Sequence, residues 1–332
     1  MGVSVFGMHR SGTSVLAATL VGLGLDAGRP ETLMPADEGN PEGYFEQLPI
    51  VALNDEILAR LGGRWDSPPL LGEGWLRAED LERARGLLEE LYPTRAFVMK
   101  DPRVCVLADL WRQAAAEQMA GVFIVRDPLE VAWSLARRDA IPVLTGLALW
   151  AAFNRAAVAG MRGLPVVACN YSELVERPED VLGPLGAALR DWGQLTAPDL
   201  AGALSRVNPD LRRNTAPVGG DRRTEAPAEI AELHEHLRAL SGVHAHFSAP
   251  CPEPSWWELA LLEERRLLVA EREASVSERD ATIAELVAGN GALRAQSDEL
   301  ARDLALTRAD FERLRTSTPV RVLRAVGRLT RR

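Results

Sequence analysis

Short apolar runs alternate with longer segments of helical periodicity over the first 170 residues of the chain. Four runs have the length and composition of buried strands: residues 3–6, 96–99, 122–125 and 166–169. Helical spacing of apolar residues covers the segments between them: residues 14–25, 76–91, 107–119, 128–138 and 144–161. Uniformly apolar strands separated by helices are typical of a parallel sheet that is covered on both faces. The pattern therefore predicts an α/β domain with a P-loop-like parallel sheet flanked by helices.

The pattern changes after residue 208. Residues 208–228 are polar and rich in Arg, Pro and Gly, which indicates a surface loop, and residues 228–240 have helical spacing. Prolines at positions 250, 252 and 254 then interrupt the chain. We therefore expect a first domain over residues 1–250.

Residues 256–315 contain no proline and carry a seven-residue apolar repeat at Leu262, Val269, Val276, Ile283, Leu304 and Phe311. A second seam three residues later holds Leu286, Leu293, Leu300 and Leu314, but Arg265, Arg272 and Arg279 occupy its first half. Asn290 and Ser297 interrupt the first seam and Thr307 the second, although a single Asn on a seam can fix the register of a coiled coil. The repeat predicts a coiled coil, most simply a homodimer. A long helix that folds back on the first domain is the alternative.

The last segment, residues 316–332, carries five arginines and no acidic residue. Val320, Leu323, Val326 and Leu329 recur at helical spacing between the arginines. The pattern predicts a basic amphipathic helix that contacts an anionic membrane surface or a partner. A solvated tail is the alternative.

Composition restricts the class of protein further. The chain has 332 residues, of which 47% are hydrophobic and 26% charged, values that exclude wholesale disorder. A net charge of -9 argues against nucleic-acid binding. The three cysteines lie far apart and form no metal-binding pair, so we expect reduced thiols and no metal site. No signal-peptide pattern and no apolar run of roughly 20 residues is present, so we expect a cytoplasmic protein with membrane association through the basic tail.

The first motif that carries chemistry is Gly-Met-His-Arg-Ser-Gly-Thr-Ser, residues 7–14, between the first strand and the first helix. A glycine-rich turn at a helix start directs backbone amides at a phosphate or similar anion. Gly7 and Gly12 have the spacing of a nucleotide-binding P-loop, but Thr13 occupies the position of its lysine and the cation is Arg10. These differences disfavour a kinase or an NTPase.

The second motif is Arg126-Asp127-Pro128, which follows the strand 122–125 and opens a helix that contains Ser134. Asp127 suits the helix cap and Pro128 its first position. Arg126 leaves the carboxyl edge of the strand, and Ser134 lies two turns into the helix. Both can reach a second anion close to the first motif.

Together the two motifs resemble the PAPS-dependent sulfotransferase family, and their loop is similar to that of bacterial, carbohydrate-directed members. The resemblance covers roughly residues 1–215 and includes Lys100-Asp101-Pro102-Arg103 and Asn170-Tyr171-Ser172-Glu173-Leu174. It implies a metal-free reaction with 3′-phosphoadenosine 5′-phosphosulfate (PAPS) as the sulfuryl donor. The implied donor-binding residues are His9, Arg10, Ser11, Gly12, Thr13 and Ser14 at the 5′ group, and Arg126, Ser134, Tyr171 and Arg212, with Arg213, around the rest of the donor. Arg10 would also act catalytically by neutralising charge on the leaving oxygen.

A hydroxyl acceptor needs a general base, and Glu46 at the end of the Gly-Tyr-Phe-Glu segment is our candidate. Asp101 and Glu42 are its rivals, while Lys100 and Arg103 either orient a substrate or form ion pairs. We therefore expect an enzyme that transfers a sulfuryl group from PAPS to a hydroxyl, of a carbohydrate or a glycolipid. A P-loop small-molecule kinase is the first alternative, and a non-catalytic coiled-coil scaffold is the second.

Overall fold

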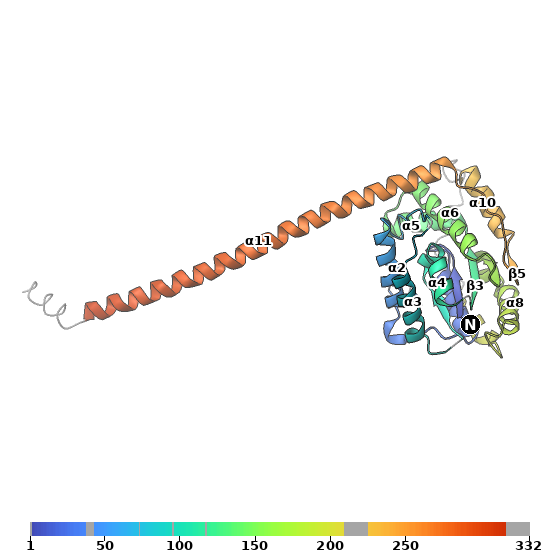
Figure 1. Ribbon diagram of the computed structural model, residues 1–332, viewed down its shortest axis with the longest axis horizontal. Helices are drawn as coiled ribbons and strands as arrows, with labels where there is room; N and C mark the ends of the chain where they lie inside the picture. The colour runs from blue at the N-terminus through green and yellow to red at the C-terminus, as the bar shows by residue number, and fades with distance from the viewer. Residues whose placement is uncertain are drawn as a thin grey trace, which may run out of the picture. The chain divides into compact units, whose positions relative to one another are not determined.

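The computed structural model describes residues 2–37, 43–72, 74–94, 96–116, 118–208 and 225–316 (Figure 1). The predicted basic tail and the predicted donor ligands Arg212 and Arg213 lie outside these ranges, as does Glu42. The chain divides into two compact units, Met1–Val269 and Ala270–Arg332.

A five-stranded sheet forms the centre of the first unit. Its strands are β1 (Gly2–Phe6), β2 (Val98–Lys100), β3 (Met119–Val125), β4 (Val166–Asn170) and β5 (Gly242–His244), in the order β2-β1-β3-β4-β5. The first four strands are parallel, with Val3 beside Ala120 and Gly121 beside Val166. Only β5 is antiparallel, against β4. The predicted α/β fold with a parallel sheet is confirmed.

Side chains alternate between the two faces of the sheet, and helices cover both. Val122 and Ile124 of β3 pack into a core with α1 (Thr13–Gly22), α8 (Pro178–Asp191) and α9 (Leu200–Leu204). Phe123 and Val125 point into the opposite core. That core is built with α2 (Leu48–Arg60), α3 (Ala78–Leu91), α4 (Ala108–Ala114), α5 (Pro128–Asp139), α6 (Val143–Gly160) and α10 (Ala228–Arg238). Both faces are apolar, which explains why the strands show no polar alternation.

Helix α6 has the length and hydropathy of a membrane-spanning segment, a feature that sequence analysis missed. Two-thirds of that helix is buried inside the domain, including Trp150 and Phe153, which are fully buried. Its apolar composition is therefore the composition of a core helix.

Several element boundaries differ from the prediction. The predicted helix at residues 107–119 ends at Ala114, and Met119 already opens β3. The short strand β5, the one-turn segments η1 (Pro30–Thr32) and η2 (Pro102–Cys105), and α7 (Tyr171–Glu176) were not foreseen. Strand β5 has no buried residue, so its sequence lacks the apolar run that marked the others.

The long helix α11 (Trp256–Thr316) begins inside the first unit. Glu258 in its first turn is 1% exposed and pairs with Arg155 of α6, and Arg265 pairs with Asp66 at 2.5 Å. Trp257 packs on the core of the domain. The first turns of α11 therefore belong to the domain fold, beyond the boundary expected at residue 250. The helical conformation agrees with the heptad pattern, whereas pairing into a coiled coil stays a prediction.

Candidate functional site

The first motif forms the loop between β1 and α1 and takes an unusual backbone conformation there. Arg10 has φ 69° and Gly12, which caps α1, has φ 90°. A positive φ costs energy in a residue with a side chain such as Arg10, and such strain gathers at functional sites. Gly12 has no side chain to cap the helix, so the first amides of α1 are left for an anion.

Gly12 is required at its position for a second reason. A Cβ atom there would lie 2.3 Å from the ring of Tyr171, the first residue after β4. The same ring also contacts the Arg126 guanidinium, whose central carbon lies 4.3 Å from the ring centroid. Three segments far apart in the chain are thus packed together around one aromatic ring, and their donor atoms gather at the carboxyl edge of β1, β3 and β4.

The second motif also contacts the loop by direct hydrogen bonds. Arg126 Nη1 donates to the Arg10 carbonyl at 3.1 Å, and Arg10 Nε donates to Ser134 Oγ at 2.9 Å. Glu130, one turn along α5, pairs with Arg126 at 2.8 Å, and both side chains are almost fully buried. Sequence analysis identified Arg126 and Ser134 but missed Glu130, which already compensates part of the charge of Arg126.

A cavity of about 710 Å³ opens in front of these residues. The predicted site residues that line it are His9, Arg10, Gly12, Thr13, Ser14, Glu46, Arg126, Ser134 and Tyr171. Ser11 does not line it: its side chain is fully buried and its amide donates to the Met8 carbonyl at 3.1 Å. Except for Ser11, and for Arg212, which lies outside the described residues, the structure therefore brings the candidate residues together at one cavity.

Glu46 reaches the cavity from the residues just before α2, which pair with the residues just after η1. Leu33 and Gln47 form an antiparallel bridge, and the Met34 amide donates to the Glu46 carbonyl at 2.7 Å. The Glu46 carboxylate is 5% exposed and bonds to Lys100 Nζ at the end of β2. Arg103 Nη1 lies 3.8 Å from its other oxygen. A carboxylate and two cations thus form the wall of the cavity that includes the end of β2.

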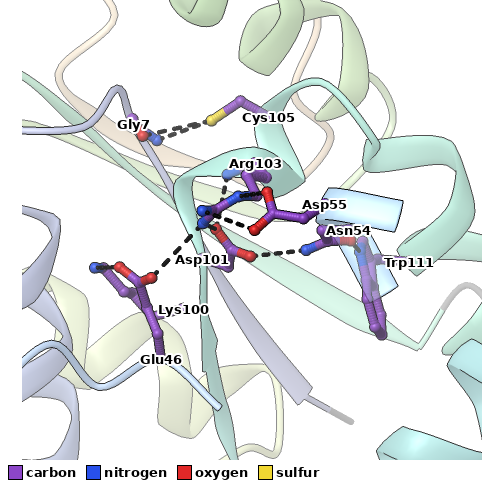
Figure 2. A network of polar contacts seen from close by, with 9 residues as sticks. All are labelled: Gly7, Glu46, Asn54, Asp55, Lys100, Asp101, Arg103, Cys105 and Trp111. Atoms are coloured by element: carbon purple, nitrogen blue, oxygen red, sulfur yellow. Dashed lines mark hydrogen bonds and ion pairs between the residues drawn. The ribbon is translucent and has the colours of Figure 1, made fainter. Parts of the chain in front are cut away.

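Asp101, a rival of Glu46, lies in a buried network behind this wall (Figure 2). Its carboxylate is 0% exposed and accepts hydrogen bonds from Asn54, the Arg103 amide and the Arg103 side chain at 2.8–3.0 Å. Asn54 in turn accepts from Trp111 Nε1 at 2.9 Å. Asp101 does not line the cavity, so its hydrogen bonds shape η2 and hold Arg103 in place.

Burial and charge shift the pKa values of several cavity residues, among them Glu46, His9 and Arg10. Burial raises the pKa of the Glu46 carboxyl, and Lys100 offsets only part of that rise. Burial, with Arg103 and Lys100 next, lowers the pKa of His9 well below its usual value. Burial also lowers the pKa of Arg10, and the charge of Arg138 adds to this. Crowded cations of this kind favour a bound anion.

Five further charged or aromatic residues of the cavity were missed as site residues by sequence analysis. They are Arg137 and Arg138 of α5, Asp37 and Tyr44, and Trp65, which lies against His9 with ring centroids 4.6 Å apart. A signal for the two arginines was available, since residues three and four positions after Ser134 share its helix face. The Trp65 contact depends on tertiary packing alone. No group of three or more His, Cys, Asp or Glu side chains is placed to hold a metal ion within the described ranges.

No family model and no curated protein matches the chain. Among solved structures, it is similar to the sulfotransferase domain from the curacin biosynthetic pathway, with 17% identity over 79% of this chain and 96% of that one, at a TM-score of 0.38. It is also similar to the sulfotransferase domain from the Synechococcus PCC 7002 olefin synthase, with 19% identity over 80% and 94% of the two chains, at a TM-score of 0.34. Likenesses this distant carry no functional assignment, which rests instead on the site.

Proposed function

We propose that the chain is a sulfotransferase that moves a sulfuryl group from PAPS to an acceptor hydroxyl. One observation carries the proposal: the Arg10 loop, Arg126 and Ser134 meet at a single cation-rich cavity, and Glu46 faces the same cavity. Two anion-binding elements suit a donor with two separated anionic groups. A buried carboxylate nearby suits the removal of a proton from a hydroxyl.

The donor would occupy the side of the cavity formed by the loop and α5. Amides at the start of α1, with the side chains of Thr13 and Ser14, would hold its 5′-phosphosulfate. Arg126 and Ser134, with Tyr171 beside them, would hold its 3′-phosphate. Arg10 would stabilise the negative charge that develops on the bridging oxygen as the sulfur–oxygen bond to the donor breaks.

The acceptor would approach from the side of Glu46 and Lys100. Its hydroxyl oxygen forms the new bond to sulfur, and its proton passes to the Glu46 carboxylate. The raised pKa of Glu46 makes it a stronger base than an exposed carboxylate, and its ion pair with Lys100 fixes its position. From the resemblance of the loop to carbohydrate-directed members, we propose a carbohydrate or glycolipid hydroxyl as acceptor. From the basic sequence of residues 316–332, we propose that the protein is cytoplasmic and associates with a membrane.

Ligand binding tests the donor class. Adenosine 3′,5′-bisphosphate, the product of PAPS, should raise the Tm of the full chain, by linkage equal to about 2.7 kcal/mol at a hundredfold excess over Kd. ATP with Mg²⁺ should raise it far less, because Thr13 stands where a P-loop kinase has its lysine. Stabilisation by ATP with Mg²⁺ and none by the bisphosphate would favour the small-molecule kinase instead.

A matched pair of ligands tests the 3′-phosphate site. Arg126 and Glu130 form a buried ion pair, so the suitable variant replaces both residues, Arg126→Met with Glu130→Leu. This variant should weaken binding of the bisphosphate more than binding of adenosine 5′-phosphosulfate, which lacks the 3′ group. Equal losses for the two ligands would contradict the assignment of Arg126.

A further inference from the structure

The part of α11 in the second unit carries a stripe of large apolar side chains along one helix face. Its members are 56–65% exposed: Ile283, Leu286, Leu293, Leu300, Leu304, Phe311 and Leu314. They fall on the two seams of the heptad repeat from residue 283 onward. A stripe of this length in contact with water marks an interaction surface.

The stripe begins where the arginines of the second seam end. Arg265 is engaged by Asp66 within the first unit, and Arg272 and Arg279 occupy the next two positions of that seam. From Leu286 onward, leucine holds the seam except at Thr307. The segment from 283 to 314 therefore has the composition of a pairing surface, and the segment before Ile283 does not.

We propose that residues 283–314 pair with the same segment of a second copy of the chain, as a parallel two-stranded coiled coil in register. The charges beside the seams determine the direction. On one flank, the positions just before the first seam are Gly289, Gln296, Asp303 and Asp310, which include acids and no base. On the other flank, the positions just after the second seam are Val287, Arg294, Ala301, Arg308 and Arg315, which include bases and no acid.

A parallel pair sets each flank against the opposite flank of its partner, five residues further along. Asp303 then faces Arg308 of the second copy, and Asp310 faces its Arg315. An antiparallel pair sets each flank against the same flank, so arginines would face arginines and aspartates would face aspartates. Charge complementarity therefore favours the parallel arrangement.

Two pairs within the helix use the same charges. Asp310 lies 3.7 Å from Arg313, and Arg315 lies 2.7 Å from Glu312. These side chains are 48–84% exposed, so the pairs are weak and can exchange for partners on the second helix.

Asn290 supplies the register. It occupies the first seam between Ile283 and Ser297. In a parallel pair in register, each Asn290 amide lies opposite the other and the two can hydrogen-bond. A shift by one heptad would place Asn290 against Ile283 of the partner and leave its amide unsatisfied, which opposes the shift.

Cysteine cross-linking of the full chain tests both direction and register. The chain would carry Cys251→Ser, because Cys251 is half-buried while Cys105 and Cys169 are buried. Leu286→Cys and Leu300→Cys, introduced separately, should each give a covalent dimer on oxidation, since seam positions of a parallel pair face their own copies. Leu306→Cys is the matched control. Leu306 is 66% exposed and lies off both seams, so this variant should not cross-link.

Light scattering of the unmodified chain should give twice the monomer mass at micromolar concentration. An antiparallel pair can bring only one of the two seam positions onto its symmetry axis, because they lie about 21 Å apart along the helix. A dimer in which at most one of the two variants cross-links would therefore overturn the parallel arrangement. A monomer would overturn self-pairing altogether.

Discussion

The two walls of the cavity are built in different ways. The first wall consists of the loop 7–14 together with Arg126 and Ser134. Its loop is one continuous segment, and it presents backbone amides whose directions depend on Gly12 and on the positive φ of Arg10. The opposite wall comes from segments far apart in the chain. Glu46 precedes α2, Lys100 ends β2, and Trp65 follows α2, so only tertiary packing brings these side chains to the cavity.

The walls also differ in how their charges are balanced. On the second wall the Glu46 carboxylate pairs with Lys100, and Arg103 bonds to Asp55 and Asp101 (Figure 2). On the first wall Arg10 bonds to the neutral Ser134 hydroxyl. The first wall is therefore suited to hold an anion, and the second to hold a reactive carboxylate in a fixed position. Substitutions on the two walls should therefore affect donor binding and turnover differently.

Glu46→Gln should have the largest effect, because it removes the proposed base of the second wall. Loss of a positioned base lowers turnover by about 10²–10⁴-fold. Affinity for adenosine 3′,5′-bisphosphate should stay close to that of the wild type, since the first wall is intact. Steady-state turnover and calorimetric titration of the bisphosphate measure the two quantities.

The control for this variant separates chemistry from the ion pair. Glu46→Gln leaves the Lys100 ammonium buried beside a neutral amide, so Lys100→Met is added to remove the unpaired charge. The double variant should recover Tm but not turnover. Recovery of both would show that Glu46 is only an ion-pair partner. The rate of the wild type should also fall as the pH drops through the raised pKa of Glu46, because a protonated carboxyl cannot accept the proton.

Arg10→Gly should have the next largest effect and should separate activity from stability. Removal of the cation should lower turnover about 10²–10³-fold, as for other groups that stabilise developing charge. Glycine adopts a positive φ without strain but gains entropy in the unfolded chain, so the free energy of unfolding should change by less than about 1 kcal/mol. Turnover at saturating donor and urea denaturation check this pair of outcomes.

Arg10→Lys is the matched control, because it keeps the charge and loses the Nε hydrogen bond to Ser134. It should retain more turnover than Arg10→Gly. If the two variants lost turnover equally, the geometry of the guanidinium and not its charge would matter.

The first wall could be predicted from the sequence, and most of the second could not. The loop follows a strand and opens a helix, and this context together with its glycine spacing indicated an anion site. Arg126 and Ser134 were predicted for the same reason, since they lie on the next parallel strand and its helix. By contrast, the partners of Lys100 and the contact between Trp65 and His9 depend on packing between distant segments. Glu46 was identified from its local segment, but its burial was not.

The start of α11 likewise shows that contacts between distant segments cannot be predicted from the sequence. Its heptad pattern indicated a helix exposed on all but one face, yet Glu258 is buried against Arg155. Arg265 was interpreted as an interruption of a seam, whereas it pairs with Asp66 beside Trp65. Periodicity shows which face is apolar but not which charged residue has a buried partner.

Truncation of α11 should therefore affect only the second wall. A chain that ends at residue 254 lacks Glu258 and Arg265, while one that ends at residue 269 keeps both. The free energy of unfolding of the shorter chain should be lower by about 2–3 kcal/mol. This loss is smaller than is usual for a broken buried ion pair, because Arg155 becomes exposed to water. This corresponds to roughly 4–12 °C in Tm. The longer chain should unfold with the Tm of the full domain.

Ligand binding by the two truncated chains sharpens the comparison. Both should bind adenosine 3′,5′-bisphosphate, because no hydrogen bond or ion pair joins the loop 7–14 to α11 among the described residues. The shorter chain should show a higher KM for the acceptor with nearly unchanged turnover at saturation, since Arg265 no longer holds Asp66 in the turn that carries Trp65. Equal KM values for both chains would mean that Arg265 does not position that wall.

His9 should give the smallest effect, and it responds to the charges of both walls. Its Nε2 is buried, and burial lowers its pKa, with the charges of Arg103, Lys100, Arg138 and Arg10 adding to the effect. The folded chain therefore binds fewer protons at this site than the unfolded chain, whose histidine has a pKa of about 6.5. Stability from this group is present above that pH and is lost as the pH falls, by at most about 1.4 kcal/mol per pH unit.

His9→Gln should flatten the pH dependence of the unfolding free energy between pH 7 and pH 5, measured by urea denaturation. Saturating bisphosphate should flatten it in the wild type too, because an anion on the first wall raises the pKa of His9. An unchanged slope in the His9→Gln chain would assign the pH dependence to another group.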